Sequence, residues 1–84
     1  MRILFSETSW EEYLFWQKAD QKKLVRINDL IKNIQRSSFT GVGKPEPLRH
    51  DLKGYWSRRI DHEHRLVYKV ESNTLYVAQC RYHY

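Results

Sequence analysis

The stretch from Ser37 to Lys53 constrains the fold of this 84-residue chain more than any other part of the sequence. It contains both prolines and two of the three glycines, Gly41 and Gly43. Proline lacks a backbone donor and glycine favours turns, so neither a continuous helix nor a continuous strand fits here. Regular structure is therefore expected before and after this segment. An irregular segment of this length in a compact domain is uncommon and often functional.

The residues before this segment predict a short strand followed by a helix. Residues 2–5 indicate the strand, and Ser6 to Gln17 indicate the helix. Thr8, with Glu11 three residues later, has the form of a capping box, and Ser6 is a rival N-cap. The apolar face of this helix is expected to contain Trp10, Tyr13 and Leu14, widened by Phe15 and Trp16.

A second helix is predicted to begin after Asp20, a natural N-cap. Its apolar residues recur at spacings of three and four: Leu24, Ile27, Ile31 and Ile34, flanked by Val25 and Leu30. The opposite face is basic and carries Lys22, Lys23, Arg26, Lys32 and Arg36. This face is either simply solvated or in contact with phosphate. The two helices would form a hairpin whose apolar stripe needs a sheet beneath it.

Three strand-like stretches follow the irregular segment, at residues 55–60, 65–70 and 75–81. The turns between them, at 61–63 and 71–73, are short, so the strands should pair as an antiparallel meander. The predicted fold class is therefore α+β: an N-terminal strand, a two-helix hairpin and a three-stranded meander in one domain, residues 1–84. The helices should cover one face of the sheet and leave the other open for a site.

The charge of the chain makes a polyanionic partner a natural hypothesis. The formal net charge is +5 and the pI is near 9.5, which favours nucleic acid and also suits an ordinary soluble domain. Its one cysteine, Cys80, excludes an internal disulfide framework and is expected to be buried on a strand. The sequence shows no signal peptide and no apolar run long enough for a membrane span, so we expect a cytoplasmic protein.

A zinc site is the competing interpretation of the four histidines and one cysteine. His62 and His64 lie two residues apart in a predicted turn, but no second ligand pair with zinc-binding spacing accompanies them. We therefore expect no metal and no other cofactor.

Strand alternation places two arginines on the open face of the sheet. If Leu66 and Tyr68 face the core, Arg65 faces the other way, and Arg59 on the preceding strand can meet it across the turn. Paired guanidinium groups bind phosphate well, although two solvated arginines would look the same in sequence. The same alternation puts Arg58 on the apolar face, a conflict that the sequence leaves open.

Glu46 lies between two prolines, Pro45 and Pro47, which stiffen the backbone that presents its carboxylate. A fixed carboxylate suits a general base, although an isolated acid in a polar loop is more often a surface residue. Arg49 and His50 follow closely and would supply positive charge nearby.

The last five residues are Cys80, Arg81, Tyr82, His83 and Tyr84. A histidine can protonate a leaving oxygen, and tyrosines can stack on bases. One carboxylate, one imidazole and one or two arginines are sufficient to cut RNA through attack of the ribose 2′-OH on the adjacent phosphorus. The products would be a 2′,3′-cyclic phosphate and a 5′-hydroxyl. The chain end is also expected to be held by few neighbours.

Four stretches together give the chain its resemblance to the YoeB toxins of the RelE superfamily. They are Gly43-Lys44-Pro45-Glu46-Pro47-Leu48, Trp56-Ser57-Arg58-Arg59-Ile60, Glu63-His64-Arg65-Leu66-Val67-Tyr68 and Cys80-Arg81-Tyr82-His83-Tyr84. The resemblance covers the whole chain. It implies a RelE-like fold and a ribosome-dependent endoribonuclease that cuts translated mRNA in the A site.

The resemblance also assigns roles to individual residues. Glu46 would be the general base, His83 the general acid and Arg65 the group that stabilises the transition state, with Arg59 and Tyr84 supporting phosphate and nucleotide.

The resemblance further implies a homodimer, a YefM-type antitoxin that silences it, and the 70S ribosome with its mRNA as partners. Tyr82, Arg49 and His50 would help to bind the substrate. Arg49 stands where some relatives have lysine, and because arginine does not deprotonate, this argues against a proton-transfer role there.

Two other functions fit parts of the sequence. A toxin of the same fold that resembles ParE would bind gyrase without cutting RNA, and a plain basic module would only bind RNA. Glu46, Arg65 and His83 together favour the nuclease, because a protein that only binds needs no matched acid and base.

Overall fold

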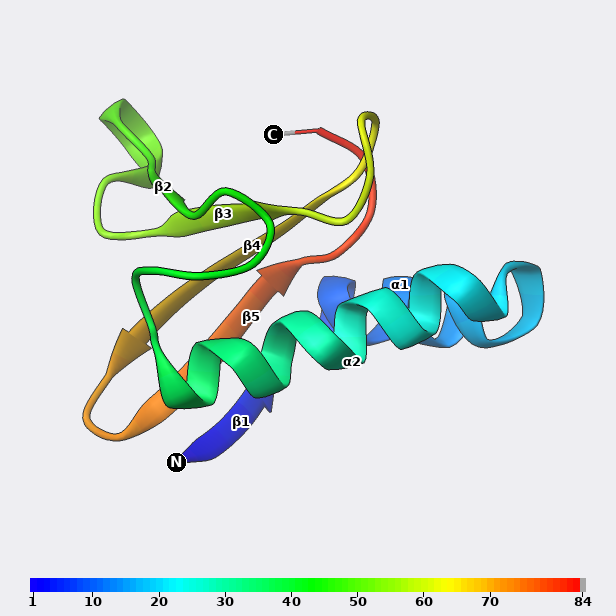
Figure 1. The fold of residues 1–84 in the computed structure, drawn as a ribbon, viewed down its shortest axis with the longest axis horizontal. Coiled ribbons are helices and arrows are strands. Elements are labelled where there is room, and N and C mark those ends of the chain that lie inside the picture. Colours follow the sequence, from blue (N-terminus) through cyan, green and yellow to red (C-terminus); the bar gives the residue numbers. More distant parts are fainter. Residues whose placement is uncertain (84) are drawn as a thin grey trace.

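The computed structural model describes residues 1–83, which form two helices and a five-stranded mixed sheet (Figure 1). The elements are β1 (Arg2–Phe5), α1 (Glu7–Ala19), α2 (Gln21–Arg36), β2 (Glu46–Pro47), a short 3₁₀ turn η1 (His50–Leu52), β3 (Trp56–Arg59), β4 (Arg65–Glu71) and β5 (Thr74–Gln79). The α+β class and the order of its main elements are thus confirmed.

The sheet contains the predicted antiparallel meander and extends it at both edges. Its strand order is β1-β5-β4-β3-β2, with β1 parallel to β5 and all other neighbours antiparallel. The two-residue strand β2 was not predicted, because the glycines and prolines around it excluded a longer strand. It lies at the edge of the sheet, where a proline without an N–H donor is tolerated.

Helix α1 begins at the rival cap rather than at the predicted capping box. The Ser6 hydroxyl accepts a hydrogen bond from the backbone N–H of Ser9 at 3.0 Å, so Thr8 lies inside the helix. The predicted apolar face was also only partly right. Trp16 is buried, whereas Trp10 is 46% exposed and packs at the surface against the rings of Phe5 and Tyr13.

Helix α2 follows the prediction except at Val25, which is 55% exposed. The Asp20 carboxylate caps it by accepting from the N–H of Lys22, and Ile27, Leu30, Ile31 and Ile34 are buried. These side chains recur at helical spacing, so one stripe of α2 packs on the sheet. The core joins them to Trp16 of α1 and to Ile60, Leu66, Tyr68, Leu75, Val77 and Cys80.

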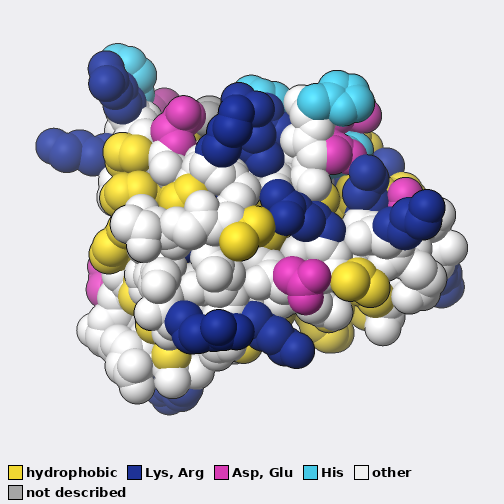
Figure 2. Space-filling view, viewed as in Figure 1, with side chains coloured by type: hydrophobic (Ala, Val, Ile, Leu, Met, Phe, Trp, Pro, Cys, Tyr) yellow, Lys and Arg dark blue, Asp and Glu magenta, His cyan; other side chains and the backbone are white. Residues whose placement is uncertain are grey.

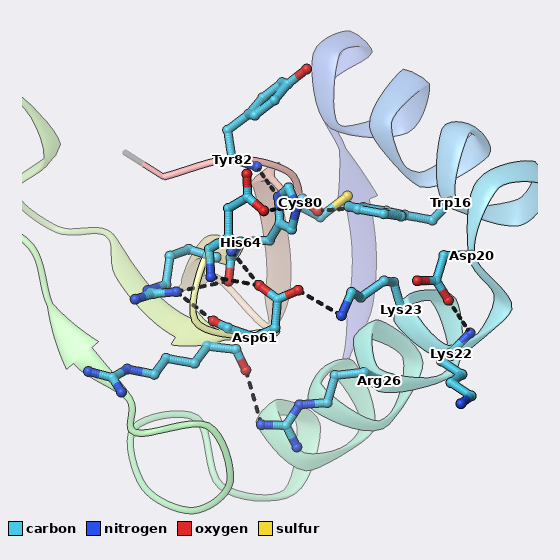
Figure 3. Close-up of polar contacts among 12 residues, drawn as sticks. Trp16, Asp20, Lys22, Lys23, Arg26, Asp61, His64, Cys80 and Tyr82 are labelled. Carbon is cyan, nitrogen blue, oxygen red and sulfur yellow. Dashed lines mark hydrogen bonds and ion pairs between the residues drawn. The ribbon is translucent and has the colours of Figure 1, made fainter.

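The basic face of α2 is not merely solvated. Lys23 forms a 2.7 Å ion pair with Asp61, and Arg26 donates to the backbone carbonyl of Arg59 at 3.0 Å. Both contacts fasten α2 to the end of β3 and the turn that leads into β4 (Figure 3).

The sheet face opposite the helices is not open along its whole length, because the C-terminal segment covers part of it. Ser57, Arg65 and Val67 lie on this face but are 3%, 9% and 2% exposed. Strand β5 ends at Gln79 instead of the predicted Arg81, and the chain then crosses to the start of β4, where Arg65 N–H bonds to the carbonyl of Tyr82 at 3.0 Å. This crossing brings His83 to a space that it lines together with Glu46 of β2 and with Ser57 and Arg59 of β3.

Candidate functional site

A small polar cleft of about 180 Å³ lies where β2, β3, β4 and the chain end meet. Four of the predicted site residues line it: Glu46, Arg59, Arg65 and His83. Lys44 and Ser57 complete its lining. The cleft therefore combines one carboxylate, one imidazole and three cationic side chains drawn from distant parts of the sequence.

Strand β2 presents the carboxylate. Glu46 pairs with Ser57 and Pro47 pairs with Trp56, and the pairing continues through the N–H of Leu48, which donates to Tyr55 at 2.9 Å. Glu46 is thus held by sheet hydrogen bonds and not by an irregular loop as predicted.

The two arginines of the cleft are paired across β3 and β4. Arg59 is the direct partner of Arg65 in the strand register, as predicted. Nη1 of Arg65 donates to the carbonyls of Asp61 at 2.7 Å and of His64 at 3.1 Å, which fixes the plane of its guanidinium group. Because Nη1 carries two of the five N–H donors of an arginine, Nε and Nη2 are left to other partners.

Arg58, which strand alternation placed on the apolar face, has a structural role there. Its side chain is fully buried on the core face and donates to the carbonyls of Ser37 at 2.6 Å, Thr40 at 2.9 Å and Val42 at 3.0 Å. It also donates to the side chains of Asn33 and Tyr68.

The acceptors of Arg58 are therefore mostly backbone carbonyls of the irregular segment. A buried charge is tolerated only when its donors are satisfied, and these carbonyls perform that task. Further along the same segment the carbonyl of Gly43, a residue with a left-handed φ of 87°, accepts from the N–H of Arg59 at 2.7 Å. Arg58 and Gly43 thus hold the chain that leads into Lys44 and Glu46.

The C-terminal tail is held at alternate residues. The N–H of Cys80 donates to the Glu12 carboxylate at 2.9 Å, and its carbonyl accepts from Trp16 Nε1 at 2.8 Å. The N–H of Tyr82 donates to Nδ1 of His64 at 2.7 Å, while the Tyr82 carbonyl accepts from the N–H of Arg65 (Figure 3).

The side-chain amide of Gln79 adds bonds to the carbonyls of Arg81, Tyr82 and His83 at 3.0, 3.3 and 3.1 Å. The expectation that few neighbours hold the chain end was therefore wrong for residues 80–83.

Tyr82 is the bend that directs the tail toward the cleft. Its φ of 66° lies in the left-handed region, which costs a residue other than glycine about 1–3 kcal/mol and persists only where surrounding contacts enforce it. Tyr82 is 53% exposed. The Arg81 guanidinium carbon lies 4.5 Å from the centroid of the Tyr82 ring and 3.6 Å from that of Phe15. The Tyr82 side chain does not line the cleft, whereas the next residue, His83, does.

The remaining predicted residues lie elsewhere. Arg49 and His50 line a neighbouring hollow of about 550 Å³ that shares Glu46 with the cleft. Tyr84 lies outside the described residues. Arg49 and His50 are thus near the carboxylate but not among the groups that surround the cleft.

Burial shapes the ionisation of two groups behind the tail. Burial raises the pKa of Glu12, although the N–H of Cys80 and the charge of Arg81 act in the opposite direction. Burial, reinforced by the Glu12 charge, raises the pKa of the Cys80 thiol to about 12. A thiol with so high a pKa carries little thiolate near neutral pH, so Cys80 acts as a core residue.

Sequence reasoning missed Lys44, Ser57 and His64. Lys44 is two residues before Glu46, but its left-handed φ of 53° breaks the extended alternation between them, so no local pattern specified its position. Strand alternation puts Ser57 on the open face with Arg59, but its place beside Glu46 depends on the register of β2 and β3, which no local pattern specifies. His64 was considered as a metal ligand and belongs to a stretch that carries the family resemblance, but no role in the site was assigned to it.

Within residues 1–83, no three His, Cys, Asp or Glu side chains are grouped as they would be around a metal ion. No helix in the same range is both long and apolar enough to cross a membrane.

Comparisons with known proteins agree on one family. The family described as YoeB-like toxin of bacterial type II toxin-antitoxin system matches residues 5–84. Toxin YoeB of Escherichia coli K12 is 55% identical over the full length of both chains. The solved structure of a YoeB/ParE toxin from Agrobacterium tumefaciens matches with a TM-score of 0.98 and 51% identity, again over the full length of both.

Structures from Staphylococcus aureus show relatives in assemblies. A YoeB dimer, 48% identical, matches with a TM-score of 0.94, and the toxin of a YoeB-YefM complex, 47% identical, matches equally well. In both cases the match covers 100% of this chain and 98% of the other.

Proposed function

The chain belongs to the YoeB-like toxins of bacterial type II toxin-antitoxin systems, and from this premise we propose that it is a ribosome-dependent endoribonuclease that cuts translated mRNA in the A site. The observation that supports this most directly is that Glu46, Arg65 and His83 line one cleft. A toxin that acted only by binding would not need a carboxylate, an imidazole and a guanidinium group around the same small space.

The reaction proceeds by transfer of the scissile phosphate to the neighbouring 2′-oxygen. Glu46 removes the proton of the ribose 2′-OH, and that oxygen forms a bond to phosphorus as the bond to the 5′-oxygen breaks. His83 gives a proton to the departing 5′-oxygen. One proton is taken up and one is released, so the products are a 2′,3′-cyclic phosphate and a 5′-hydroxyl, and no metal is needed.

Arg65 stabilises the negative charge that develops on the phosphate oxygens. Its Nη1 is fixed by the carbonyls of Asp61 and His64, so the guanidinium group needs no reorientation when the charge appears. Arg59 lies opposite it in the strand register and Lys44 shares the cleft, so both add positive charge around the same phosphate. Tyr84 supports the nucleotide.

The partners follow from the family and the substrate. The YoeB-YefM complex and the YoeB dimer of Staphylococcus aureus support a YefM-type antitoxin and a homodimer for this chain. The site of action would be the translating 70S ribosome in the cytoplasm. Figure 2 shows Lys and Arg side chains spread over the visible face, an arrangement suited to contact with ribosomal RNA at many points.

Translation in vitro with purified protein tests this function. Mapping the mRNA ends should show cleavage within A-site codons, with cyclic phosphate and 5′-hydroxyl termini. Glu46→Gln and His83→Gln should each lose cleavage while they still bind ribosomes. The matched control is His62→Gln, since His62 is exposed and does not line the cleft.

A non-catalytic inhibitor is the alternative that this experiment separates. If purified protein cut no mRNA but bound gyrase, the ParE-like function would replace the nuclease. If it bound RNA and the Glu46→Gln variant behaved as wild type, a plain RNA-binding module would be the better description.

A further inference from the structure

We propose that His64 is a positioning residue for the reaction: it holds the backbone of Tyr82 and thereby places His83 against Arg65. The inference rests on the proposed function, because it assumes that His83 donates a proton in the cleft. His64 itself does not line the cleft, and its action is exerted through the tail.

The first observation is that two adjacent residues bind both polar backbone groups of Tyr82. The His64 side chain accepts from its N–H at 2.7 Å, and the N–H of Arg65 donates to its carbonyl at 3.0 Å. Arg65 lines the cleft, and so does His83, the residue after Tyr82. The two bonds therefore set the register between the guanidinium group and the imidazole.

The second observation is that the surroundings of His64 hold its ring in place. The residue is 8% exposed and its ring packs edge-on against Trp16, with ring centroids 4.9 Å apart. Trp16 uses its own Nε1 to bind the carbonyl of Cys80, so one rigid pair of rings supports the tail at two points. The backbone N–H of His64 is bound by Asp61 at 2.6 Å.

The third observation concerns the tautomer of His64. Because Nδ1 accepts the N–H of Tyr82, it cannot carry a proton, and the ring proton must lie on Nε2. Nε2 is 3.5 Å from the Glu63 carboxylate, which favours a proton at that nitrogen. The acceptor is therefore specified by the neighbours of the ring and faces the tail.

Because Tyr82 is left-handed, its two backbone hydrogen bonds also determine the direction in which the chain continues to His83. A residue with φ of 66° relaxes readily when its contacts are lost. Relaxation of Tyr82 would redirect His83, and a misplacement of about 1 Å is enough to lower a reaction rate about 100-fold.

Two substitutions separate positioning from packing. In His64→Asn the amide oxygen can occupy the place of Nδ1 and accept the same N–H, whereas in His64→Gln the amide lies one bond further out. Glutamine, however, fills the space beside Trp16 better than asparagine, so a packing role predicts that Gln is the milder change.

We expect the opposite order in the cleavage rate. At saturating ribosomes, single-turnover cleavage should fall about 100-fold in His64→Gln and stay within about 10-fold of wild type in His64→Asn. Both variants should bind ribosomes with unchanged affinity. In thermal melting, His64→Gln should be at least as stable as His64→Asn. His62→Asn, on the exposed neighbour, is the matched control.

The Tyr82 N–H can also be removed without touching His64. The native Cys80 allows residues 1–79 to be ligated to a synthetic Cys80–Tyr84 peptide in which an ester replaces the amide between Arg81 and Tyr82. This protein should cut as slowly as His64→Gln, whereas the ligated all-amide protein should match wild type.

The outcomes distinguish the two proposals. If wild type cuts no mRNA, the proposed nuclease function fails, while hydrogen exchange of the Tyr82 amide still reports whether His64 protects it. The positioning role of His64 is overturned if wild type cuts mRNA and His64→Gln, His64→Asn and the ester protein all cut at the wild-type rate. It is also overturned if the cleavage rates of the variants follow their thermal stabilities.

Discussion

Lys23 and Asp61 form an ion pair of 2.7 Å that ties helix α2 to the turn between β3 and β4. The same carboxylate accepts from the backbone N–H groups of Glu63 and His64 at 2.8 and 2.6 Å. The Asp61 carbonyl in turn binds Nη1 of Arg65. One aspartate therefore shapes the turn from which both His64 and Arg65 project.

Replacement of Asp61 by asparagine should make stability depend less on pH. Burial would raise the pKa of Asp61, but hydrogen bonds from Lys23 and from the N–H groups of His64 and Glu63 outweigh it and hold the pKa well below its usual value. A carboxyl whose folded pKa is lowered stabilises the fold above its unfolded pKa, and this stability is lost as the pH falls toward the folded value.

Asp61→Asn should therefore cost about 1–3 kcal/mol at pH 7, and the difference from wild type should shrink below about pH 4. Urea unfolding at several pH values measures this difference in the free energy of unfolding. Asp29→Asn, on an exposed position of α2, is the control and should show neither effect. A pH-independent difference would contradict the role given to the carboxylate.

Arg58→Met should destabilise the fold strongly, because it leaves the carbonyls of Ser37, Thr40 and Val42 without their buried donor. Each buried carbonyl left unsatisfied costs about 1–3 kcal/mol, so the free energy of unfolding should fall by several kcal/mol. Arg59→Met, on the exposed neighbour, should lie within about 0.5 kcal/mol of wild type. Similar urea midpoints for the two variants would refute this assignment.

Ser6→Ala tests which residue caps α1. The Ser6 hydroxyl binds the N–H of Ser9, so its removal should cost about 1 kcal/mol, whereas Thr8→Ala should cost less than about 0.5 kcal/mol. Thermal unfolding followed by circular dichroism compares them. The reverse order would restore the capping box suggested by the sequence.

Lys44→Ala should lower mRNA cleavage about 10-fold or more, because it removes one of three cationic groups around the phosphate. Lys44→Arg should retain more of the rate, since it keeps the charge. The control is Lys53→Ala, because Lys53 is exposed and does not line the cleft. Equal rates for Lys44→Ala and Lys53→Ala would show that Lys44 has no part in the reaction.

Local patterns in the sequence were enough to predict most of the elements. The stripe of Ile27, Ile31 and Ile34 predicted α2, and alternation around Leu66 and Tyr68 predicted the direction in which Arg65 points. These predictions succeeded because helical and strand periodicities relate residues only two to four positions apart. The chemical types of Glu46, Arg65 and His83, together with the motifs around them, indicated the candidate site before its geometry was known.

Tertiary structure alone decided how that site is held together. The bonds that place the tail join Cys80 to Glu12, 68 residues away, and to Trp16, 64 residues away. Tyr82 and His64 are 18 residues apart. No local periodicity relates such pairs, because a hydrogen bond between them exists only after the chain has folded. The sequence by itself determined which groups can do the chemistry, and the folded chain determined which of them meet.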